Sequence, residues 1–349
     1  MRIVVAMSGG VDSSVAAALL AEAGHDVVGV SMQLYDNSQG FGTCCTIDDL
    51  HDARQVAAAI GIPHYIVNFE SHFHRHVQDD FVREYASGRT PIPCAHCNSE
   101  VKFTELLLRA GGFGASQLAT GHYARIEPTA EGRLRLLRGR DPLKDQSYFL
   151  FSLTQAQLGQ ARFPVGHLTK DEVRQAAERL GLAVAAKPDS QEICFVPDGD
   201  YARFLEAQVP ALATGGTIVD GDGAVIGRHG GVHRFTVGQR KGLGLATGIP
   251  LYVVGIDAGR QEVTVGPREA LDRARLTASR VNWIAPPPAD WREAQVQIRH
   301  RHAAAPARVR PLDGTRAEVE FTVPQSAVAP GQAAVFYDGD EVLGGGWID

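Results

Sequence analysis

The amino-acid sequence predicts an α/β fold, in which an N-terminal domain with a parallel sheet precedes a small, mostly β central domain and a C-terminal β-barrel. Three observations support this fold class. Strand-like and helix-like segments alternate over the first 125 residues, helical periodicity fades after about residue 205, and the tail alternates apolar and polar residues. The length of 349 residues suits two or three domains, which we expect at 1–204, 205–275 and 276–349.

The N-terminal segments follow one another as strand, helix, strand, helix and strand. Valine-rich runs mark the strands, and the helices are expected to end before Gly24, Gly61 and Gly181. Short connections between alternating strands and helices imply a parallel sheet with right-handed crossovers. Strands are expected at residues 2–7, 25–32, 64–69 and 117–121, and helices at 11–23, 47–60, 99–110 and 170–180, the last capped by Thr169.

The C-terminal part has the pattern of small β domains. Glycine-rich turns separate short β-like runs between residues 215 and 248, and three prolines at 286–288 mark a linker. Beyond this linker, short runs such as 318–323 and 333–337 alternate apolar and polar residues, which indicates a small β-barrel.

Composition excludes several classes of protein. Apolar residues make up 44% and charged residues 21% of the chain, as in ordinary globular proteins. No run approaches the roughly 18 apolar residues that a membrane span needs, and five cysteines are too few for a disulfide scaffold. Because the N-terminus has no signal-peptide pattern, we expect a cytoplasmic protein with no membrane partner. The formal net charge of −6 arises within residues 1–200, so the C-terminal part remains compatible with an anionic partner.

A glycine-rich loop, Ser8-Gly9-Gly10-Val11-Asp12-Ser13-Ser14, separates the first expected strand from the first helix. Such a loop brings backbone amides and the positive end of a helix toward an anion, and its serine hydroxyls add hydrogen-bond donors. Asp12 suits a Mg²⁺ ion that bridges phosphates. The loop lacks the lysine of Walker-type loops, which cleave ATP at the γ-phosphate. A plain turn that begins a helix is the structural alternative.

The cysteines fall into pairs along the chain. Cys94 and Cys97 form a C-x-x-C in a proline-stiffened loop before an expected helix, a position that lowers the pKa of a thiol. A zinc half-site is the alternative, but no second C-x-x-C completes it. Cys194, taken alone, is typical of a small buried residue. Cys44 and Cys45 are expected to be thiols of a loop.

Clusters of histidine and arginine are further candidates. His72, His74 and His76 alternate, but the pattern around them is helical, so we expect a solvated surface and not a metal site. The segment 292–310 holds five arginines and one acid, which favours contact with nucleic-acid phosphates over a solvated β face. A second basic surface is expected at His229, His233, Arg234, Arg240 and Lys241.

Taken together, the glycine loop and the two cysteine motifs resemble the tRNA-specific 2-thiouridylase family, whose glycine loop is that of the N-type ATP pyrophosphatases. The resemblance implies an adenine nucleotide α-hydrolase-like N-terminal domain. The matching stretches are spread over most of the chain and follow the same order as in the family. It is carried by residues 7–14, 52–54, 61–65, 88–98, 102–103, 120–123, 144–150, 189–195 and 236–242.

The resemblance also implies a role for individual residues. Cys97 matches the family's nucleophile and Cys194 matches the cysteine that carries a persulfide, so the two are expected to form a transient disulfide. The expected ATP contacts are Ala6, Met7, Ser8, Gly9, Gly10, Val11, Asp12, Ser13, Met32 and Gly121. The expected contacts with the target base are Ile92, Pro93 and Cys94, and those with tRNA are Lys144, Asp145, Gln146, Arg299 and His300.

The chain departs from the family pattern at the expected base-contact loop. Many members have Asn-Pro-Asp where this sequence has Ile92-Pro93-Cys94, so a general-base role for an acidic residue is not available here. The change provides a third thiol, and Cys94, Cys97 and Cys194 together would be sufficient ligands for a 4Fe–4S cluster with one open position. We favour the persulfide route over this cluster.

The reaction implied by the resemblance is ATP-dependent 2-thiolation of the wobble uridine of tRNA, with AMP and pyrophosphate as products. It requires ATP, Mg²⁺ and a persulfide donor such as a cysteine desulfurase or a sulfur-relay protein. An amidating synthetase of the same superfamily is a rival, but it needs an ammonia source that the sequence does not show. A non-catalytic module that binds ATP and RNA is a rival of another class.

Overall fold

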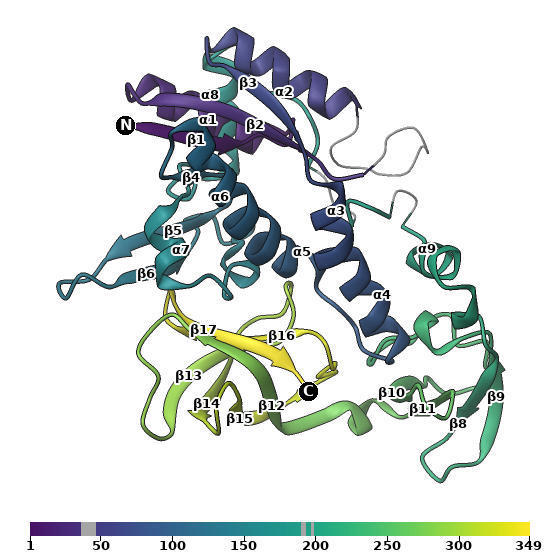
Figure 1. Ribbon diagram of the computed structural model, residues 1–349. Coiled ribbons are helices and arrows are strands. Elements are labelled where there is room, and N and C mark those ends of the chain that lie inside the picture. The colour runs from purple at the N-terminus through teal and green to yellow at the C-terminus, as the bar shows by residue number, and fades with distance from the viewer. Residues whose placement is uncertain (36–46, 190–192, 197–198) are drawn as a thin grey trace. The chain divides into compact units, whose positions relative to one another are not determined.

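The computed structural model describes residues 1–35, 47–189, 193–196 and 199–349 (Figure 1). The chain forms two compact units. The first comprises Met1–Val77, Cys94–Gly199 and Asp340–Val342, and the second comprises Gln78–Pro93, Asp200–Gly339 and Leu343–Asp349. The finer division at 1–204, 205–275 and 276–349 stays a prediction.

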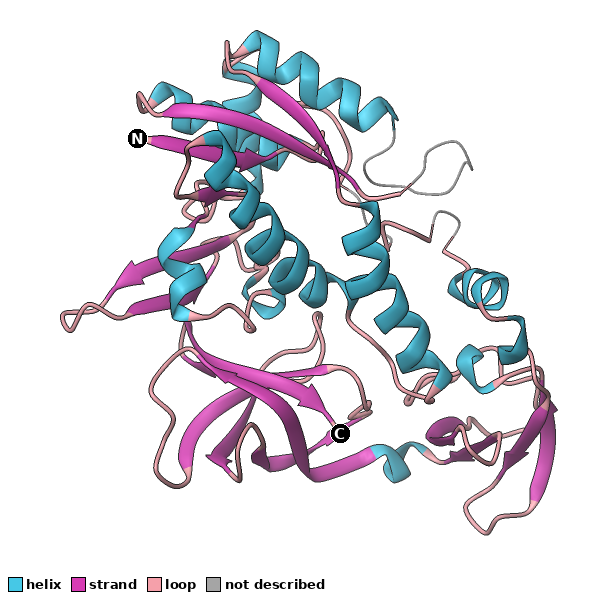
Figure 2. Cartoon of the chain, in the orientation of Figure 1, coloured by secondary structure: helices cyan, strands magenta, loops and turns pink. Residues whose placement is uncertain are grey.

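The first unit is built on a five-stranded sheet in which all neighbouring strands are parallel, as the sequence predicts (Figure 2). The strand order β3-β2-β1-β4-β7 places the N-terminal strand at the centre. Its strands are β1 (Arg2–Ala6), β2 (Asp26–Gln33), β3 (His64–Asn68), β4 (Leu118–Ala119) and β7 (Ala161–Arg162).

Three helices pack against this sheet, namely α1 (Val11–Glu22), α2 (Ile47–Ala59) and α8 (Lys170–Arg179). Their buried residues, such as Val15, Val56 and Val173, form one core with Ile3 of β1. The side chain of Thr169 caps α8 in a reciprocal capping box with Glu172, which confirms the predicted cap.

The other elements before residue 180, apart from α4, are short. α5, η3 and α6 follow without a break, so the helix expected to start at residue 99 begins at Pro93 instead. The rings of His72 and His76 stack 6.5 Å apart, as expected for a helix. These elements are α3 (Glu70–Phe73), the π-helices η2 (His74–Gln78) and η3 (Cys97–Leu106), α5 (Pro93–His96), α6 (Leu107–Ala110), η4 (Gly111–Phe113), β5 (Ala124–Pro128), β6 (Leu134–Arg138), η5 (Ser147–Phe149) and α7 (Gln155–Gln160).

A small β sheet begins the C-terminal part of the second unit. Its strand order is β10-β11-β8-β9, with β11 and β8 parallel and the other pairs antiparallel. Ile218, Val253 and Val263 are at the centre of its core. The elements of this region are α4 (Asp79–Ala86), α9 (Tyr201–Gln208), η6 (Pro210–Leu212), β8 (Gly216–Val219), β9 (Val225–His229), η7 (Val232–Arg234), β10 (Tyr252–Asp257), β11 (Glu262–Gly266) and η8 (Arg268–Leu271).

Six antiparallel strands then form a closed barrel, which confirms the prediction for the tail. The order is β12-β15-β14-β13-β16-β17, and β12 pairs with β17 to close it. Val296, Val309 and Phe336 point into its core. The strands are β12 (Asp272–Trp283), β13 (Arg292–Gln297), β14 (Ala305–Pro311), β15 (Ala317–Ser326), β16 (Ala333–Asp338) and β17 (Glu341–Ile348).

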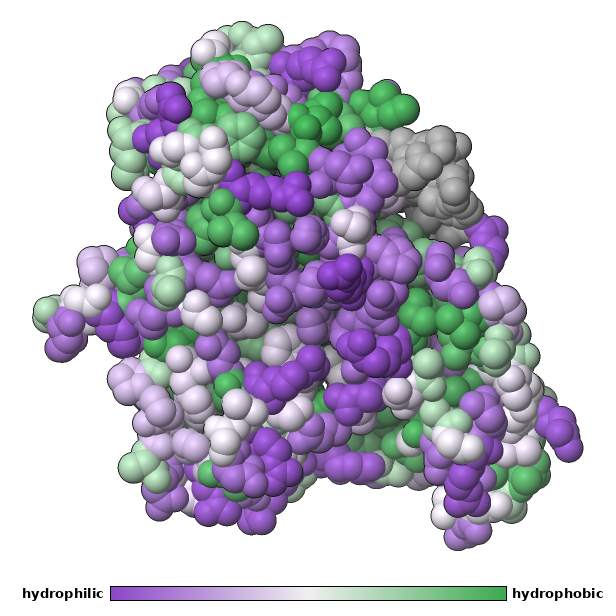
Figure 3. Space-filling view, in the orientation of Figure 1, coloured by the Kyte–Doolittle hydropathy of each residue, from purple (hydrophilic) through white to green (hydrophobic). Residues whose placement is uncertain are grey.

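Among the described residues, no helix has the length and apolar character needed to cross a membrane. The face drawn in Figure 3 carries hydrophilic residues over much of its area, with apolar residues in separate patches.

Candidate active site

A cavity of about 220 Å³ lies where β1 and β2 end and α1 begins. The carboxyl ends of parallel strands are the edge at which open α/β sheets bind ligands. Lys102, His122 and Gln146 contribute to its wall. It is also lined by seven of the residues predicted to contact ATP, namely Ala6, Met7, Ser8, Asp12, Ser13, Met32 and Gly121.

The serines of the glycine loop fix its shape. Ser13 Oγ accepts a hydrogen bond from the amide of Ser8 at 3.1 Å, and the hydroxyls of Ser13 and Ser14 donate to the carbonyl of Gly10 at 3.2 and 2.8 Å. α1 begins at Val11 with Gly10 as its N-cap and without a side-chain cap. Its first amides therefore have no side-chain acceptor, which is the arrangement that binds an anion.

Two glycines are required by close backbone contacts. Gly9 has a φ of 75°, and a Cβ atom there would lie 2.2 Å from the carbonyl oxygen of Asp49. Gly121 packs against the start of α1, where a Cβ atom would lie 2.5 Å from the nitrogen of Ser13. Any larger residue at either position would displace the loop.

Lys187 also holds the glycine loop. Its ammonium donates to the carbonyl of Gly9 at 3.1 Å and to the carboxylates of Asp49 and Asp52 at 2.6 and 2.5 Å. Burial lowers the pKa of Lys187, but the two carboxylates outweigh burial and raise it above its ordinary value. The loop is thus attached to α2 by a charged lysine.

Asp12 is already engaged by two donors. Its Oδ1 accepts from the hydroxyl of Tyr123 at 2.7 Å and from Lys170 Nζ at 2.7 Å, and its Oδ2 accepts from Lys170 Nζ at 2.9 Å. Burial, followed by the charge of Asp12, raises the pKa of Tyr123, so that the phenol stays protonated. Both oxygens of the expected magnesium ligand therefore accept hydrogen bonds from side chains of the protein.

The surroundings of Asp12 do not fit a Mg²⁺ site held by the protein. An ammonium group lies beside the carboxylate, and the described part of the chain contains no group of three His, Cys, Asp or Glu side chains placed to hold a metal ion. Magnesium held near Asp12 through the phosphates of ATP stays a prediction, and within the described structure Asp12 holds Lys170 and Tyr123.

Lys170 joins Asp12 to a second carboxylate. Its side chain is 9% exposed, and its Nζ lies 2.6 Å from Oδ1 of Asp189. The other oxygen of Asp189, Oδ2, lies 2.7 Å from the ammonium of Lys144. Burial raises the pKa of Asp189, but the two lysines outweigh burial and bring it below its ordinary value. This network links the glycine loop to the expected tRNA-contact stretch and to the segment that leads to Cys194.

The other two residues of that stretch have internal partners. Asp145 is 8% exposed, and its carboxylate accepts from Arg138 at 2.7 Å and from the amide and the hydroxyl of Ser147 at 3.0 Å each. Gln146 makes two hydrogen bonds with the backbone of Tyr123, at 2.9 and 3.0 Å. Asp145 is therefore a structural acceptor, and contact of this stretch with tRNA stays a prediction.

Cys97 is half-buried and is the first residue of η3. Burial raises the pKa of its thiol, and the charge of Lys102 opposes this effect without cancelling it. The prediction of a lowered pKa is wrong because the helical segment begins at Pro93, so Cys97 lies one turn inside it and not at its amino end.

Sequence reasoning gave no role to Lys102 and His122, which both line the cavity. Lys102 Nζ donates to Oδ1 of buried Asn98 at 2.9 Å. His122 Nδ1 lies 2.7 Å from the hydroxyl of Thr120, and burial holds the pKa of His122 well below its ordinary value, so the ring is neutral. The only sequence signal for these two residues was their position inside the matching stretches.

Cys194 is held through its backbone. Its carbonyl accepts from the hydroxyl of Tyr35 at 3.3 Å, and Phe195 next to it is buried edge-on against Phe73, with ring centroids 5.6 Å apart. Cys194 is half-buried and forms no disulfide. These contacts fix the backbone of Cys194 and the ring of Phe195.

The three described cysteines do not form a metal-ligand set. Cys94 is exposed, Cys97 and Cys194 are half-buried, and none of the three forms a disulfide. No group of three metal-ligating side chains occurs in the ranges that the structure covers. Cys44 and Cys45 lie outside the described residues.

The expected base-contact loop is mostly buried. Ile92 and Pro93 are buried, and of the three predicted residues only Cys94 is exposed. The amide of Thr90 donates to a carbonyl of the β15–β16 loop at 2.8 Å, and Gln332 donates to the carbonyl of Thr90 at 3.0 Å. The barrel therefore fixes the chain just before Ile92.

Ion pairs neutralise most of the arginine-rich segment 292–310. Arg299 and Arg301 are the exceptions: both are exposed, and no described carboxylate lies within 4.0 Å of either. His300 is exposed beside them, and buried Gln297 shapes this turn by donating to the carbonyls of both Arg299 and His300. The neutralised pairs are Arg292–Asp338 at 2.9 Å, Arg308–Glu320 at 2.5 Å and Arg310–Glu318 at 2.7 Å.

The expected second basic surface is only partly formed. His233 is fully buried and lies 2.9 Å from a carboxylate oxygen of Glu206, which also pairs with Arg234. The prediction is therefore wrong for His233, whereas Arg234 is exposed but paired, and His229 is half-buried. Arg240 and Lys241 are exposed, and within the described chain neither has a carboxylate within 4.0 Å.

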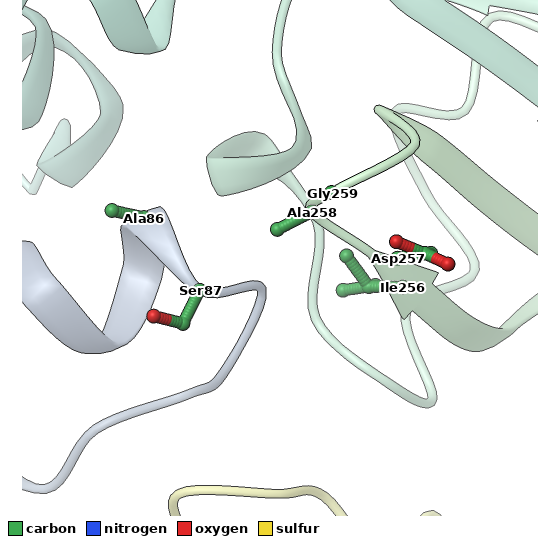
Figure 4. Close-up of a pocket in the computed structure, with 6 residues that line it drawn as sticks. All are labelled: Ala86, Ser87, Ile256, Asp257, Ala258 and Gly259. Atoms are coloured by element: carbon green, nitrogen blue, oxygen red, sulfur yellow. The ribbon is translucent and has the colours of Figure 1, made fainter.

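A second cavity, of about 630 Å³, lies in the second unit between the end of α4 and the turn after β10 (Figure 4). The wall carries one carboxylate and one hydroxyl, from Asp257 and Ser87, and includes none of the predicted site residues. It is lined by Ala86, Ser87, Ile256, Asp257, Ala258 and Gly259.

Three family matches cover nearly the whole chain. Residues 1–198 match the tRNA methyl transferase HUP domain, residues 202–267 match the tRNA methyl transferase PRC-barrel domain, and residues 273–348 match the aminomethyltransferase beta-barrel domain.

Two relatives can be aligned with this chain over its full length. A tRNA-specific 2-thiouridylase MnmA from Geobacter metallireducens is 59% identical over 355 residues, which cover 100% of this chain and 96% of the relative. A protein of the same name from Geotalea uraniireducens is 58% identical over 355 residues, covering 100% of this chain and 95% of the relative. A solved 4-thiouridine synthetase–RNA complex with bound ATP covers 60% of this chain and 50% of its own, at 19% identity and a TM-score of 0.36, which is too weak to support an argument.

The glycine loop, the two half-buried cysteines of one unit and the full-length identity to these relatives agree, and the chain belongs to the tRNA-specific 2-thiouridylase (MnmA) family.

Proposed function

We propose that this protein thiolates C2 of the wobble uridine of tRNA, using ATP to activate the C2 oxygen and a cysteine persulfide to supply the sulfur. One observation carries the proposal: a single compact unit contains both the anion-binding cavity at the glycine loop and the half-buried thiols of Cys97 and Cys194. Membership of the 2-thiouridylase family supports the same activity.

In the first step ATP occupies the cavity, with its phosphates on the amides and hydroxyls of the glycine loop. The C2 oxygen of the uridine attacks the α-phosphorus, the bond to pyrophosphate breaks, and pyrophosphate leaves. The uridine then carries AMP on its C2 oxygen. This step converts a poor leaving oxygen into a good one, which is the reason that thiolation needs ATP.

In the second step the terminal sulfur of a persulfide on Cys194 attacks C2, and AMP departs with the oxygen. The thiolate of Cys97 then attacks the sulfur attached to Cys194, and the sulfur–sulfur bond breaks toward the base. The products are 2-thiouridine and a Cys97–Cys194 disulfide, which a dithiol reductant returns to two thiols. If Cys97 attacks the persulfide first, the released hydrosulfide attacks C2 and the products are the same.

The contacts with macromolecular partners are proposed on charge and exposure. Lys144 in the first unit, which would exchange its ion pair with Asp189 for a phosphate, and Arg299 and His300 in the second are assigned to tRNA phosphates. Cys94, as the exposed residue of the base-contact loop, is assigned to the neighbourhood of the target base. The sulfur is assigned to a cysteine desulfurase or a relay protein that delivers a persulfide to Cys194.

Mass spectrometry of tRNA nucleosides tests the proposal. Unmodified tRNA is incubated with the enzyme, ATP, magnesium salt and a cysteine desulfurase with cysteine, and pyrophosphate is measured in parallel. We expect 2-thiouridine and a stoichiometric amount of pyrophosphate. Binding of ATP and tRNA without release of pyrophosphate would instead identify a non-catalytic module.

A further inference from the structure

The four lysines of the first unit differ in their partners. Three of them pair with carboxylates, so their charges are balanced inside the protein. Lys102 donates to the neutral amide oxygen of Asn98 at 2.9 Å, and no described carboxylate lies within 4.0 Å of it. The balanced pairs are Lys144–Asp189 at 2.7 Å, Lys170–Asp12 at 2.7 Å and Lys187–Asp49 at 2.6 Å.

The position of Lys102 is fixed and faces the nucleotide cavity. Its partner Asn98 is 2% exposed and donates its own amide to the carbonyl of Phe149 at 3.2 Å, so the acceptor for Lys102 is held in place. Lys102 is half-buried and forms part of the cavity wall together with Ser8 and Ser13. A half-buried ammonium that has no counter-ion among the described residues is an attractive site for an anion, because the anion relieves the cost of its partial desolvation.

Lys102 is also electrostatically coupled to Cys97. The two residues are five positions apart in η3, and in a π-helix residues at this spacing lie one turn above each other. The charge of Lys102 lowers the pKa of Cys97 against the effect of burial. The π-helical geometry thus places one ammonium beside both the cavity and the thiol.

We propose that Lys102 binds a phosphate group of the nucleotide and that the same ammonium controls the reactivity of Cys97. This inference rests on the proposed function, in which ATP fills the cavity and Cys97 reacts as a thiolate. A bound phosphate and a thiolate are both anions near one cation, so each disfavours the other. Cys97 therefore stays protonated while triphosphate or pyrophosphate is bound, and becomes more reactive when pyrophosphate leaves.

This coupling imposes an order on the reaction. A reactive thiolate present before adenylation would cleave the persulfide on Cys194 too early and release its sulfur as hydrosulfide. Competition for Lys102 delays the thiolate until the uridine has been activated, so the enzyme does not lose sulfur in unproductive turnovers.

Two measurements on the full-length protein test the proposal without relying on turnover. Calorimetry gives the affinity for inorganic pyrophosphate and for α,β-methylene ATP, and peptide-resolved mass spectrometry gives the rate at which iodoacetamide alkylates Cys97 between pH 6 and 10. For Lys102→Met we expect the affinities to fall about tenfold or more, as for a lost charge-assisted hydrogen bond. We also expect alkylation of Cys97 at pH 7 to slow about threefold or more, with its pH profile moved upward. In the wild type, saturating pyrophosphate should slow this alkylation as well.

Three further variants make the outcome decisive. Lys102→Arg keeps the charge and should restore much of both properties. Asn98→Asp keeps the side-chain shape and gives Lys102 a carboxylate, so it should weaken pyrophosphate binding even if Lys102→Met does not fold. Lys241→Met, in the second unit, should leave both measurements unchanged.

The proposal is overturned if Lys102→Met and Asn98→Asp bind pyrophosphate as tightly as the wild type, or if only one of the two properties responds. Failure of the wild type to bind either α,β-methylene ATP or pyrophosphate would instead contradict the proposed function itself.

Discussion

The ammonium nitrogen of Lys170 lies 2.7 Å from Oδ1 of Asp12, although the two residues are 158 positions apart in the chain. The contact ties the first turn of α1 to the first residue of α8, and the same ammonium lies 2.6 Å from Asp189. One lysine thus keeps two carboxylates together at the edge of the nucleotide cavity.

Replacement of this lysine is expected to destabilise the fold. Lys170→Met removes the cation beside Asp12 and leaves Asp189 with Lys144 at 2.7 Å and Arg174 at 3.7 Å. We expect the free energy of unfolding to fall by about 2–3 kcal/mol, somewhat less than for a fully buried pair. Urea denaturation measures the change. Arg179→Met, at the other end of α8, removes an exposed ion pair with Glu22 of α1 and should have no measurable effect. Equal stability of the Lys170→Met protein and the wild type would contradict the role of this network.

Asp12→Ala separates the structural role of Asp12 from that of a metal ligand. Loss of the acceptor for Tyr123 and Lys170 should lower the free energy of unfolding by about 1–2 kcal/mol in the absence of nucleotide and magnesium. Misplacement of the glycine loop should also reduce tRNA-dependent ATP–pyrophosphate exchange about tenfold. Asp12→Asn, which still accepts from Tyr123, should lose less stability. A variant that loses exchange but keeps full stability would identify Asp12 as a metal ligand after all.

The reactivity of Cys97 is expected to rise with pH through the alkaline range. Burial raises the pKa of this thiol, so at neutral pH the thiolate is a smaller fraction than for an exposed cysteine, and it increases as the pH rises toward and past the raised pKa. Alkylation of Cys97 should therefore reach half its maximal rate at a higher pH in the folded protein than in 8 M urea (about the concentration that unfolds most domains). A plateau already reached at pH 7 would show that the thiol is activated.

Cys94→Ser distinguishes the two routes for sulfur. In the persulfide route only Cys97 and Cys194 form and break bonds to sulfur, so Cys94→Ser should keep a substantial part of the activity, while Cys97→Ser and Cys194→Ser should be inactive. In the cluster route all three thiolates are ligands, and loss of any one abolishes the site. A Cys94→Ser protein that folds and binds ATP but does not thiolate tRNA, together with a brown wild-type protein after anaerobic reconstitution with iron and sulfide, would establish the cluster.

Arg299→Ala should weaken tRNA binding without affecting the chemical steps at saturating tRNA. Loss of one phosphate contact should make the slope of log K against log salt shallower by about 0.7–0.9. Arg308→Ala is the matched control, because Arg308 is paired with Glu320 and lies over the ring of Trp291. We expect its salt slope to equal that of the wild type, and an unchanged slope for Arg299→Ala as well would remove Arg299 from the tRNA contact.

Local patterns in the sequence were sufficient for the fold class, but not for the β5–β6 hairpin or the short strand β7. Valine-rich runs and the glycines that end the helices predicted the parallel sheet, and Thr169 indicated the start of α8. These signals are local, because each depends on residues close to it in the sequence. The glycine loop could be placed for the same reason: its phosphate-binding shape depends on adjacent residues and on the helix that follows.

The partners of the charged residues could not be predicted in this way. Nothing near Asp12 in the sequence indicates Lys170, and Arg308 and Arg310 appear free until β14 pairs with β15 and brings Glu320 and Glu318 opposite them. The pKa of the Cys97 thiol could not be predicted from the sequence either. This pKa depends on burial and on where the helix begins, and the helix begins six residues earlier than expected, which reversed the expected direction.

The attachment of Gly9 to Lys187 has a thermodynamic consequence. Since the ammonium of Lys187 and the hydroxyls of Ser13 and Ser14 already hold the glycine loop in shape, binding of a nucleotide orders little additional chain. The loop acts as a rigid receptor, and its affinity is not reduced by the conformational entropy that a flexible phosphate loop loses on binding. Removal of the lysine would turn recognition of the nucleotide into coupled folding and binding, with slower association and a larger heat-capacity change.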